Sequence, residues 1–354
     1  MKKSSKVVKK PTLDYIAELA GVSKTTVSRA LNKSHLVKDD VVEHIRKIAE
    51  QAGYVNKNTK LEIPLSLTKV TFYCLDHLSN HSSFYSELIA SVKSEFEKTD
   101  IEINVVLYNK HTSSSVLLKG VSSSQAALIL GEPTEKLMAS LNDASIPTLL
   151  LNAIDDEMII PSIHPDYELG GFLAGKYLIK KGHTKIKVIT SNDRHSTIQR
   201  TDGFLRALSF AGIDFEHEDV VVDLHTYEQP VDRLNSGDFG AQDILPKLID
   251  DGLFADCTAV FCICDMIAFS LINALANANI VVPNDISVIG FDNLTLTSCV
   301  SPKLTTLNVN YNSLAQASLI KLVRLTNDPN VNGNRTAIPV SLVERESVRT
   351  LTQS

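Results

Sequence analysis

A short run of cationic and hydroxyl side chains near the start of the chain could bind a polyanion. Its members are Lys24, Thr25, Thr26, Ser28 and Arg29. Lysine and arginine donate hydrogen bonds to phosphate oxygens and to guanine, hydroxyl groups bond to phosphates, and a threonine methyl contacts the methyl group of thymine. These residue types therefore point to contacts with nucleic acid, provided that one surface presents them together.

Two short helices are predicted to position this run, from Leu13 to Ala20 and from Lys24 to Leu31. Gly21 follows the first helix, where a left-handed backbone is often needed, and Ser23 can cap the second. Apolar residues at helical spacing form the opposite face: Ile16, Ala20, Val22, Val27 and Leu31. This layout is typical of a helix-turn-helix whose second helix enters the DNA major groove, although a plain surface αα-hairpin has the same periodicity.

A third helix is predicted from Asp39 to Ala52 and ends at Gly53. Its core face contains Val42, Ile45, Ile48 and Ala49, on which Tyr54 is expected to pack. Three helices in so short a segment predict a DNA-binding headpiece over residues 1–54. Residues 55–68 are polar and are interrupted by Pro64, so we expect a hinge linker there.

The charges divide in a way that fits a headpiece on a larger body. The whole chain of 354 residues has a formal net charge of −6, but residues 1–64 carry +6 and the remainder carries −12. A basic module on an acidic body is typical of a protein that uses one end to bind phosphates.

From Lys69 onward, apolar runs of strand length alternate with helical segments. The strand-like runs are Val70–Leu75, Ile103–Tyr108, Ala126–Leu130, Thr148–Asn152, Ile186–Thr190, Val220–Val222, Ala259–Ile263 and Ser287–Phe291. The helical segments include Phe84–Glu97, Tyr167–Lys180, Gly203–Ala211 and Met266–Ala278. This alternation predicts an α/β body of two doubly wound halves, with a ligand in the crevice at the carboxyl ends of their parallel strands.

Other function classes find little support in the sequence. No stretch approaches the ~20 apolar residues of a membrane span, and no apolar run of a secretory signal follows the N-terminal lysines. The segment Cys262-Ile263-Cys264 lacks the second pair that a zinc site needs, and no catalytic motif is present. We therefore expect a cytoplasmic protein that is not an enzyme, with buried thiols and neither metal nor cofactor.

Six ordered motifs resemble those of the lactose-repressor/galactose-repressor (LacI/GalR) family. They are A-G-V-S followed by T-V-S-R and L-N in the helix pair, Gly170–His183, R-x-x-G-F-x-x-A-L from Arg200, V-P-x-D-I-S-V-I-G-F-D from Val282, P-x-L-T-T from Pro302, and V-x-R-E-S from Val343. The resemblance implies a dimeric transcription regulator with a three-helix headpiece and a body like periplasmic sugar-binding proteins.

Residue by residue, the resemblance extends to DNA contacts. Lys24, Thr25 and Arg29 match positions that contact bases in the family; for Arg29 the alternative is a solvated cation at a helix end. Phosphate contacts are implied for Thr12, Ser23, Thr26, Ser28 and Asn32. For Ser23, a pure capping role remains open, and both roles are compatible.

The linker departs from the family pattern P-N-x-x-A-R-x-L, a hinge helix whose leucine wedges into the minor groove. Asn56 stands at the proline position and Leu61 at the arginine position. Ile63 stands where the leucine would be, so it is the candidate wedge. A plain flexible linker is the alternative.

The resemblance also implies an effector site in the body. Arg200 matches a pocket arginine, and Asp292 matches a carboxylate that pairs with ligand hydroxyls. Asp265 is expected either to cap a helix or to line the pocket, and Arg194, which precedes Arg200 in a predicted loop, is either a second donor or a surface residue. Weaker candidates are Asn152 and, as a stacking wall, Tyr227 or Phe84. Cys264 replaces an asparagine that is common in the family.

These expectations combine into a repressor that binds a near-palindromic operator as a homodimer. The body, residues 69–354, is expected to divide into an N-subdomain (about 69–166 and 298–328) and a C-subdomain (about 167–297 and 329–350). A small sugar or glycoside is the favoured effector, because the candidate side chains suit hydroxyl groups. The alternatives are a purine or nucleoside effector and, from another class, a solute-binding protein of a transporter.

Overall fold

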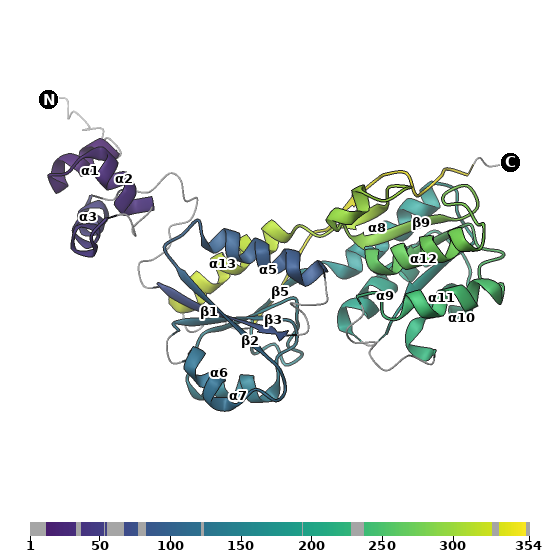
Figure 1. Cartoon of the computed structure of the whole chain (residues 1–354), viewed down its shortest axis with the longest axis horizontal. Coiled ribbons are helices and arrows are strands. Elements are labelled where there is room, and N and C mark those ends of the chain that lie inside the picture. Colours follow the sequence, from purple (N-terminus) through teal and green to yellow (C-terminus); the bar gives the residue numbers. More distant parts are fainter. Residues whose placement is uncertain are drawn as a thin grey trace, which may run out of the picture.

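The chain has three parts, a small helical headpiece and two lobes of α/β structure (Figure 1). The computed structural model describes residues 12–32, 37–52, 54, 67–76, 83–121, 124–192, 194–227, 237–327 and 333–351. Most of the predicted linker, including the candidate wedge Ile63, lies outside these residues, as does Gly53.

The headpiece consists of helices α1 (Leu13–Ala20), α2 (Lys24–Asn32) and α3 (Asp39–Gln51), which confirms the predicted helix-turn-helix. Its core is made of small and branched apolar side chains from all three helices: Ile16, Ala17, Val27, Ala30, Val42, Ile45 and Ala49. Tyr54 packs against this core, as the sequence predicts. The apolar spacing thus buries one face of each helix and leaves the other in water.

The first lobe contains a six-stranded, all-parallel sheet in the described part of the chain. In spatial order its strands are β11 (Arg335–Ile338), β5 (Ser162–Pro165), β4 (Thr148–Leu151), β3 (Ala126–Leu130), β1 (Lys69–Leu75) and β2 (Glu102–Tyr108). Helices α5 (Ser83–Phe96) and α13 (Tyr311–Asn327) lie side by side on one face, and α6 (Ser114–Val121) and α7 (Glu135–Asp143) cover the other (Figure 1).

The second lobe holds another six strands among the described residues, parallel except for the edge strand β12. Their order is β12 (Ser341–Val343), β10 (Thr305–Asn308), β9 (Ser287–Asp292), β8 (Ala259–Cys262), β6 (Ile186–Thr190) and β7 (Val221–Asp223). The associated helices are α8 (Tyr167–Lys180), α9 (His195–Phe210), α10 (His217–Val220), α11 (Ala241–Asp250), α12 (Asp265–Asn277) and the 3-10 turns η2 (Leu224–Thr226) and η4 (Thr295–Ser298).

Uninterrupted apolar runs became the central strands because both faces of those strands are covered. Every residue of β3 and of β9 is buried. This pattern is typical of parallel sheets between helix layers, where alternation with polar residues is lost. The sequence prediction of doubly wound halves is therefore confirmed.

The path of the late segments differs from the expected division of the body. Strand β10 pairs with β9 in the second sheet, although residues 298–328 were expected in the first half. Strand β11 pairs with β5 in the first sheet, although residues 329–350 were expected in the second half. The chain thus passes between the lobes three times among the described residues, after β5, after β10 and after β11. These strands are short, and their pairing is set by partners far away in the sequence.

Two smaller boundaries also differ. Leu67 is only 3% exposed and belongs to the core, so the body begins before residue 69. Helix α9 begins at His195 rather than at Gly203, which places Arg200 on a helix instead of in a loop. The polar first turns of α9 hid this start, because they carry little apolar periodicity.

Cys74, Cys257, Cys262 and Cys264 are buried free thiols, and Cys299 is exposed. No helix within the described ranges is long and apolar enough to cross a membrane.

Candidate DNA-binding and effector-binding sites

The turn of the headpiece is built by local caps. The hydroxyl of Thr12 accepts a hydrogen bond from the Tyr15 amide (3.3 Å), which starts α1, and Gly21 ends α1 in a left-handed conformation (φ 66°). The hydroxyl of Ser23 accepts from the Thr26 amide (3.1 Å) and bonds to the Thr26 hydroxyl (2.8 Å). Ser23 therefore caps α2, as one of its two predicted roles requires.

Helix α2 presents the three candidate base-contacting residues to water. Lys24, Thr25 and Arg29 are exposed, whereas Thr26 and Ser28 are half-buried. Lys24 lies 2.8 Å from the Asp14 carboxylate, and both side chains are well exposed. Such an ion pair is worth at most about 1 kcal/mol, so Lys24 can exchange this partner for DNA. Asn32 ends α2, and its side chain lies outside the described set.

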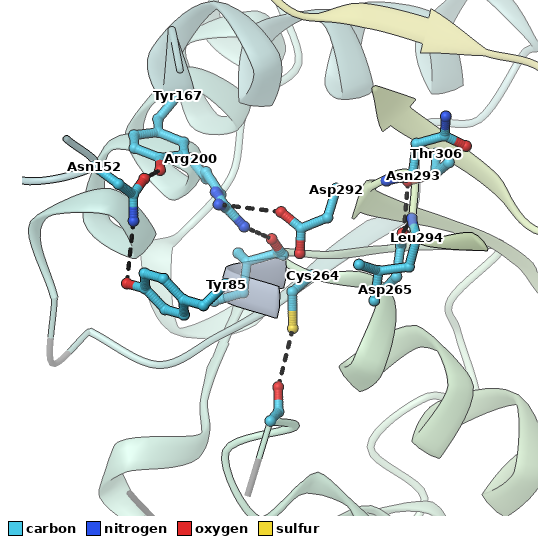
Figure 2. Close-up of polar contacts among 12 residues, drawn as sticks. Tyr85, Asn152, Tyr167, Arg200, Cys264, Asp265, Asp292, Asn293, Leu294 and Thr306 are labelled. Carbon is cyan, nitrogen blue, oxygen red and sulfur yellow. Dashed lines mark hydrogen bonds and ion pairs between the residues drawn. The ribbon is translucent and has the colours of Figure 1, made fainter. Parts of the chain in front are cut away.

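The centre of the second candidate site is a buried pair, Arg200 and Asp292, at 6% and 4% exposure. Arg200 comes from α9 and Asp292 is the last residue of β9, and Arg200 Nη2 lies 3.4 Å from Asp292 Oδ1 (Figure 2). A second guanidinium nitrogen of Arg200 donates to the Ile263 carbonyl. The planes of Tyr167 and Phe291 flank the guanidinium, with ring centroids 4.6 and 4.0 Å from its central carbon.

The pair keeps polar atoms that the described residues do not satisfy. Arg200 Nε and Asp292 Oδ1 are buried, and within the described part of the chain neither makes a hydrogen bond. A buried donor and a buried acceptor beside each other can hold a ligand that carries both functions, because burial makes an unmet polar group costly.

Two further side chains reach the same place from the first lobe. Asn152 follows β4 in a left-handed conformation (φ 60°) and donates from Nδ2 to the Tyr85 hydroxyl (3.1 Å). Tyr167, at the start of α8 in the second lobe, donates its hydroxyl to Asn152 Oδ1. Figure 2 shows this chain of hydrogen bonds running to Tyr167, whose ring lies on Arg200. Asn152 thus links the two lobes at the site.

Burial controls the ionisation of Asp292. It raises the pKa of this carboxyl to about 7, against the Arg200 charge, which lowers it, while the negative charge of Glu87 raises it further. Burial alone would lower the pKa of Arg200, but Asp292 beside it raises that pKa, so Arg200 stays cationic. Burial likewise raises the pKa of the neighbouring Cys264 thiol to about 12, so this residue contributes a neutral thiol instead of an asparagine amide.

The structure separates the remaining candidates. Asp265 is fully buried, and its carboxylate accepts from the Leu294 amide (2.8 Å) and the Thr306 hydroxyl (2.6 Å). Arg194 precedes α9, half-buried, with its guanidinium 5.2 Å from the centre of the Phe239 ring. Tyr227 is half-buried against the core after η2. Phe84 packs edge-on with Tyr85 and Tyr311.

Sequence reasoning missed Tyr85 and Tyr167 as site residues. Tyr85 is adjacent to Phe84, which the sequence did single out, and the helical periodicity of α5 does not tell which of the two aromatic residues is turned to the core. Tyr167 follows β5, a short strand that the sequence did not predict. Without that strand, the sequence offers no signal that places Tyr167 in the site.

Comparisons with known proteins agree with this division. Residues 12–57 match the family model "Bacterial regulatory proteins, lacI family", and residues 176–348 match "Periplasmic binding protein-like domain". The chain is 27% identical to the HTH-type transcriptional repressor PurR of Vibrio atlanticus and 27% identical to the ribose operon repressor of Haemophilus influenzae; each match covers 96% of this chain and 99% of the relative.

Solved structures of the same architecture include regulators with ligands. A complex of the transcriptional regulator CelR with cellobiose has a TM-score of 0.66 at 22% identity and covers 95% of this chain and 99% of the other. The lac repressor dimer bound to operator has a TM-score of 0.63 at 22% identity, with coverage of 96% and 100%. At this identity the likeness establishes the fold.

A helix-turn-helix headpiece on a two-lobed, periplasmic-binding-protein-like body defines the class of ligand-responsive transcription regulators. The chain belongs to the LacI family of bacterial regulatory proteins. It is a repressor that binds DNA and a small effector, and its family is not enzymatic. The resemblance read from the six sequence motifs is thereby confirmed.

Proposed function

We propose that this repressor binds a near-palindromic operator as a homodimer and that a small sugar or glycoside bound beside Arg200 and Asp292 switches it. The observation that carries the effector class is the buried Arg200–Asp292 ion pair, in which Arg200 Nε donates no hydrogen bond and Asp292 Oδ1 accepts none within the described residues. Adjacent hydroxyl groups of a sugar both donate and accept, so they match this pair. The guanidinium of Arg200 lies on the flat faces of Tyr167 and Phe291, and these contacts hold the guanidinium in place.

A purine or nucleoside is the second candidate. Arg194 lies near the ring of Phe239, and Tyr85 lies beside the Arg200 cluster, so a planar base would find both aromatic and cationic neighbours. The repressor PurR is a relative in the same family, and its name describes that protein alone.

A thermal-shift panel separates the two candidates. The full chain is heated with cellobiose, ribose, adenine or adenosine, each at about 100 times an assumed dissociation constant. At that ratio, a ligand that binds only the folded protein raises the free energy of unfolding by about 2.7 kcal/mol. We expect a sugar to raise the melting temperature of wild type and of Ser209→Ala, an exposed control on α9, but not of Asp292→Ala or Arg200→Lys. A shift by adenine or adenosine alone would replace the sugar proposal with the purine one.

For DNA, we propose that Lys24, Thr25 and Arg29 contact bases and that Thr12, Ser23, Thr26, Ser28 and Asn32 contact phosphates, with Ile63 as the minor-groove wedge. The exposure of Lys24, Thr25 and Arg29 on α2 supports the base contacts. A dimer places two such helices on half-sites one DNA turn apart. The lac repressor dimer on its operator has this fold.

The solute-binding alternative would leave the basic headpiece without a function. A cytoplasmic location follows from the same proposal.

Selection of duplex DNA from a random pool by the purified full chain gives the operator. We expect a site with two-fold symmetry. Arg29→Ala should weaken binding to it by about 1–3 kcal/mol and relax the preference at one base position of each half-site. Arg29→Lys is the matched control that keeps the charge. An asymmetric site, or an equal loss on every sequence, would contradict base contact by Arg29.

A further inference from the structure

The turn that presents Asp292 has an unusual backbone. Asp292 and Asn293 both have positive φ angles, 114° and 58°. A residue other than glycine in this region costs free energy unless its surroundings hold it there. Two such residues in succession, at the end of a buried strand, require specific contacts.

The first contacts come from the start of α12 and from β10. Asp265 Oδ2 accepts a hydrogen bond from the Leu294 amide at 2.8 Å, and Asp265 Oδ1 accepts from the Thr306 hydroxyl at 2.6 Å. The Thr306 hydroxyl oxygen in turn accepts from the Asn293 amide at 3.4 Å. The amides of both residues that follow Asp292 are thus tied to one buried Asp265–Thr306 pair, visible to one side of Asp292 in Figure 2.

A second set of contacts holds the Asn293 side chain. Its Oδ1 accepts from Arg345 Nη2 at 2.7 Å, and its Nδ2 donates to Asn308 Oδ1 at 2.9 Å. Arg345 also donates from Nη1 to the Leu304 carbonyl at 2.7 Å. The last segment of the second lobe therefore supports the same turn.

The sequence also makes room for Asp265. A Cβ atom on Gly290 would lie 2.3 Å from Asp265 Oδ1, closer than any real contact. The carboxylate thus occupies space that only a glycine in β9 leaves free, and both of its oxygens are used in the contacts above.

We propose that Asp265 and Thr306 are positioning residues that fix the 292–294 turn and so hold the Asp292 carboxylate against Arg200. They act on the effector through Asp292, so the proposal rests on the proposed effector role of that residue. In this proposal Asp265 does not contact the ligand itself. Its position shortly after a strand nevertheless resembles that of Asp292, which ends a strand.

The test uses the full chain with Thr306→Val, which removes the hydroxyl but keeps the shape, and Thr306→Ser, which keeps the hydroxyl. Thr71→Val is the matched control, because Thr71 is also fully buried in a strand and donates to the Gly120 carbonyl (3.0 Å) in the other lobe. Amide hydrogen exchange at Asn293 and Leu294 reports the turn. Carbon-13 NMR titration of labelled aspartate reports the surroundings of Asp292. Thermal shifts with cellobiose, ribose and adenosine report ligand binding.

We expect Thr306→Val to speed exchange at these two amides by about tenfold or more, the factor that corresponds to 1.4 kcal/mol. The Asp292 titration should move below pH 7, since burial is what raises it, and the thermal shift by any probe that stabilises wild type should disappear. Thr306→Ser and Thr71→Val should resemble wild type in all three measurements.

Unchanged exchange and titration in Thr306→Val would overturn the positioning role. If no probe stabilises wild type, the proposed effector class fails, while exchange and titration still decide the positioning role. Should Thr306→Val not fold, Asp265→Asn replaces it, because an amide can accept from only one of its two partners through oxygen. The same changes in exchange and titration are then expected.

Discussion

At the scale of single residues, burial and the Arg200 charge have opposite effects on the ionisation of Asp292. The burial on which the proposed ligand role of Arg200 and Asp292 depends also penalises the charge on Asp292, because a buried carboxylate loses its water. Arg200 offsets part of that cost from 3.4 Å, but the pKa of Asp292 still rises to about 7. This carboxyl therefore changes charge near pH 7.

We expect the free energy of unfolding to fall as pH rises from about 4 to about 7. An unfolded aspartate loses its proton near pH 4, whereas the folded Asp292 keeps it until about pH 7, so between these values the native state binds more protons. The slope from this one group is at most about 1.4 kcal/mol per pH unit. Asp292→Asn should remove it.

Chemical denaturation of wild type and Asp292→Asn at four pH values measures the difference between the two profiles. The comparison cancels titrating groups that do not interact with Asp292. Asp265 is different, because burial and the Asp292 charge both raise its pKa, so its titration belongs to the same difference between the profiles. Parallel profiles would show that Asp292 does not titrate as described. Binding of a hydroxyl ligand should weaken as pH falls below 7, because the acceptor carboxylate becomes protonated.

The packing of α8 on α9 is the decisive contact at the scale of elements. A Cβ atom on Gly203 would lie 2.0 Å from the Glu168 carbonyl oxygen, and one on Gly171 would lie 1.9 Å from the Arg200 carbonyl oxygen. The two helices approach backbone to backbone at these glycines. Helix α9 carries Arg200, so this close approach also sets the depth of the guanidinium.

Gly203→Ala should force the helices apart and displace Arg200. Overpacking of this kind costs about 1–3 kcal/mol of stability. We expect loss of the effector-induced thermal shift in the same variant. Urea unfolding and the ligand panel measure the two effects, with Ser209→Ala as the control, because Ser209 is exposed on the same helix. A Gly203→Ala protein as stable as the control would contradict the close approach.

At the scale of the whole molecule, hydrogen bonds between described residues of the two lobes meet at the candidate effector site. The Tyr311 hydroxyl on α13 donates to the Asp292 carbonyl (3.3 Å). Tyr167 bonds to Asn152 across the lobes, and Glu87 on α5 accepts from the Thr295 amide (3.3 Å) and hydroxyl (3.1 Å) on η4. Thr295 is three residues beyond Asp292. A ligand that binds more tightly to one arrangement of the lobes would shift the population toward it.

The charge division predicts how DNA binding depends on salt. A headpiece region with a charge of +6 releases the counterions of the phosphates that it binds. The logarithm of the binding constant therefore falls with the logarithm of the salt concentration, with a slope of roughly 0.9 per phosphate neutralised. We expect at least about a tenfold loss between 50 and 200 mM NaCl. Fluorescence anisotropy on the selected operator measures it, with melting curves at both salt concentrations as the control for folding. An affinity independent of salt would be inconsistent with a headpiece that binds phosphates.

Local pattern was enough for the headpiece and for the central strands. Helical spacing, the Ser23 cap and Gly21 specify α1 and α2 through contacts within a few residues. Long apolar runs such as β3 can only lie between two helix layers. The motifs around Arg200 and Asp292 also predicted that both residues belong to one site, and the structure places their side chains 3.4 Å apart.

Only the tertiary structure decided which lobe receives β10 and β11 and what each acidic residue does. The two strands are short, and β11 is only partly buried, so their pairing depends on distant partners rather than on their own pattern. Asp265 and Asp292 look alike in sequence, one just after a buried strand and one at the end of another. The fold turns one carboxylate toward the Leu294 amide and Thr306 and the other toward Arg200. Local sequence sets where a side chain leaves the backbone, but its role depends on the segments that fold around it.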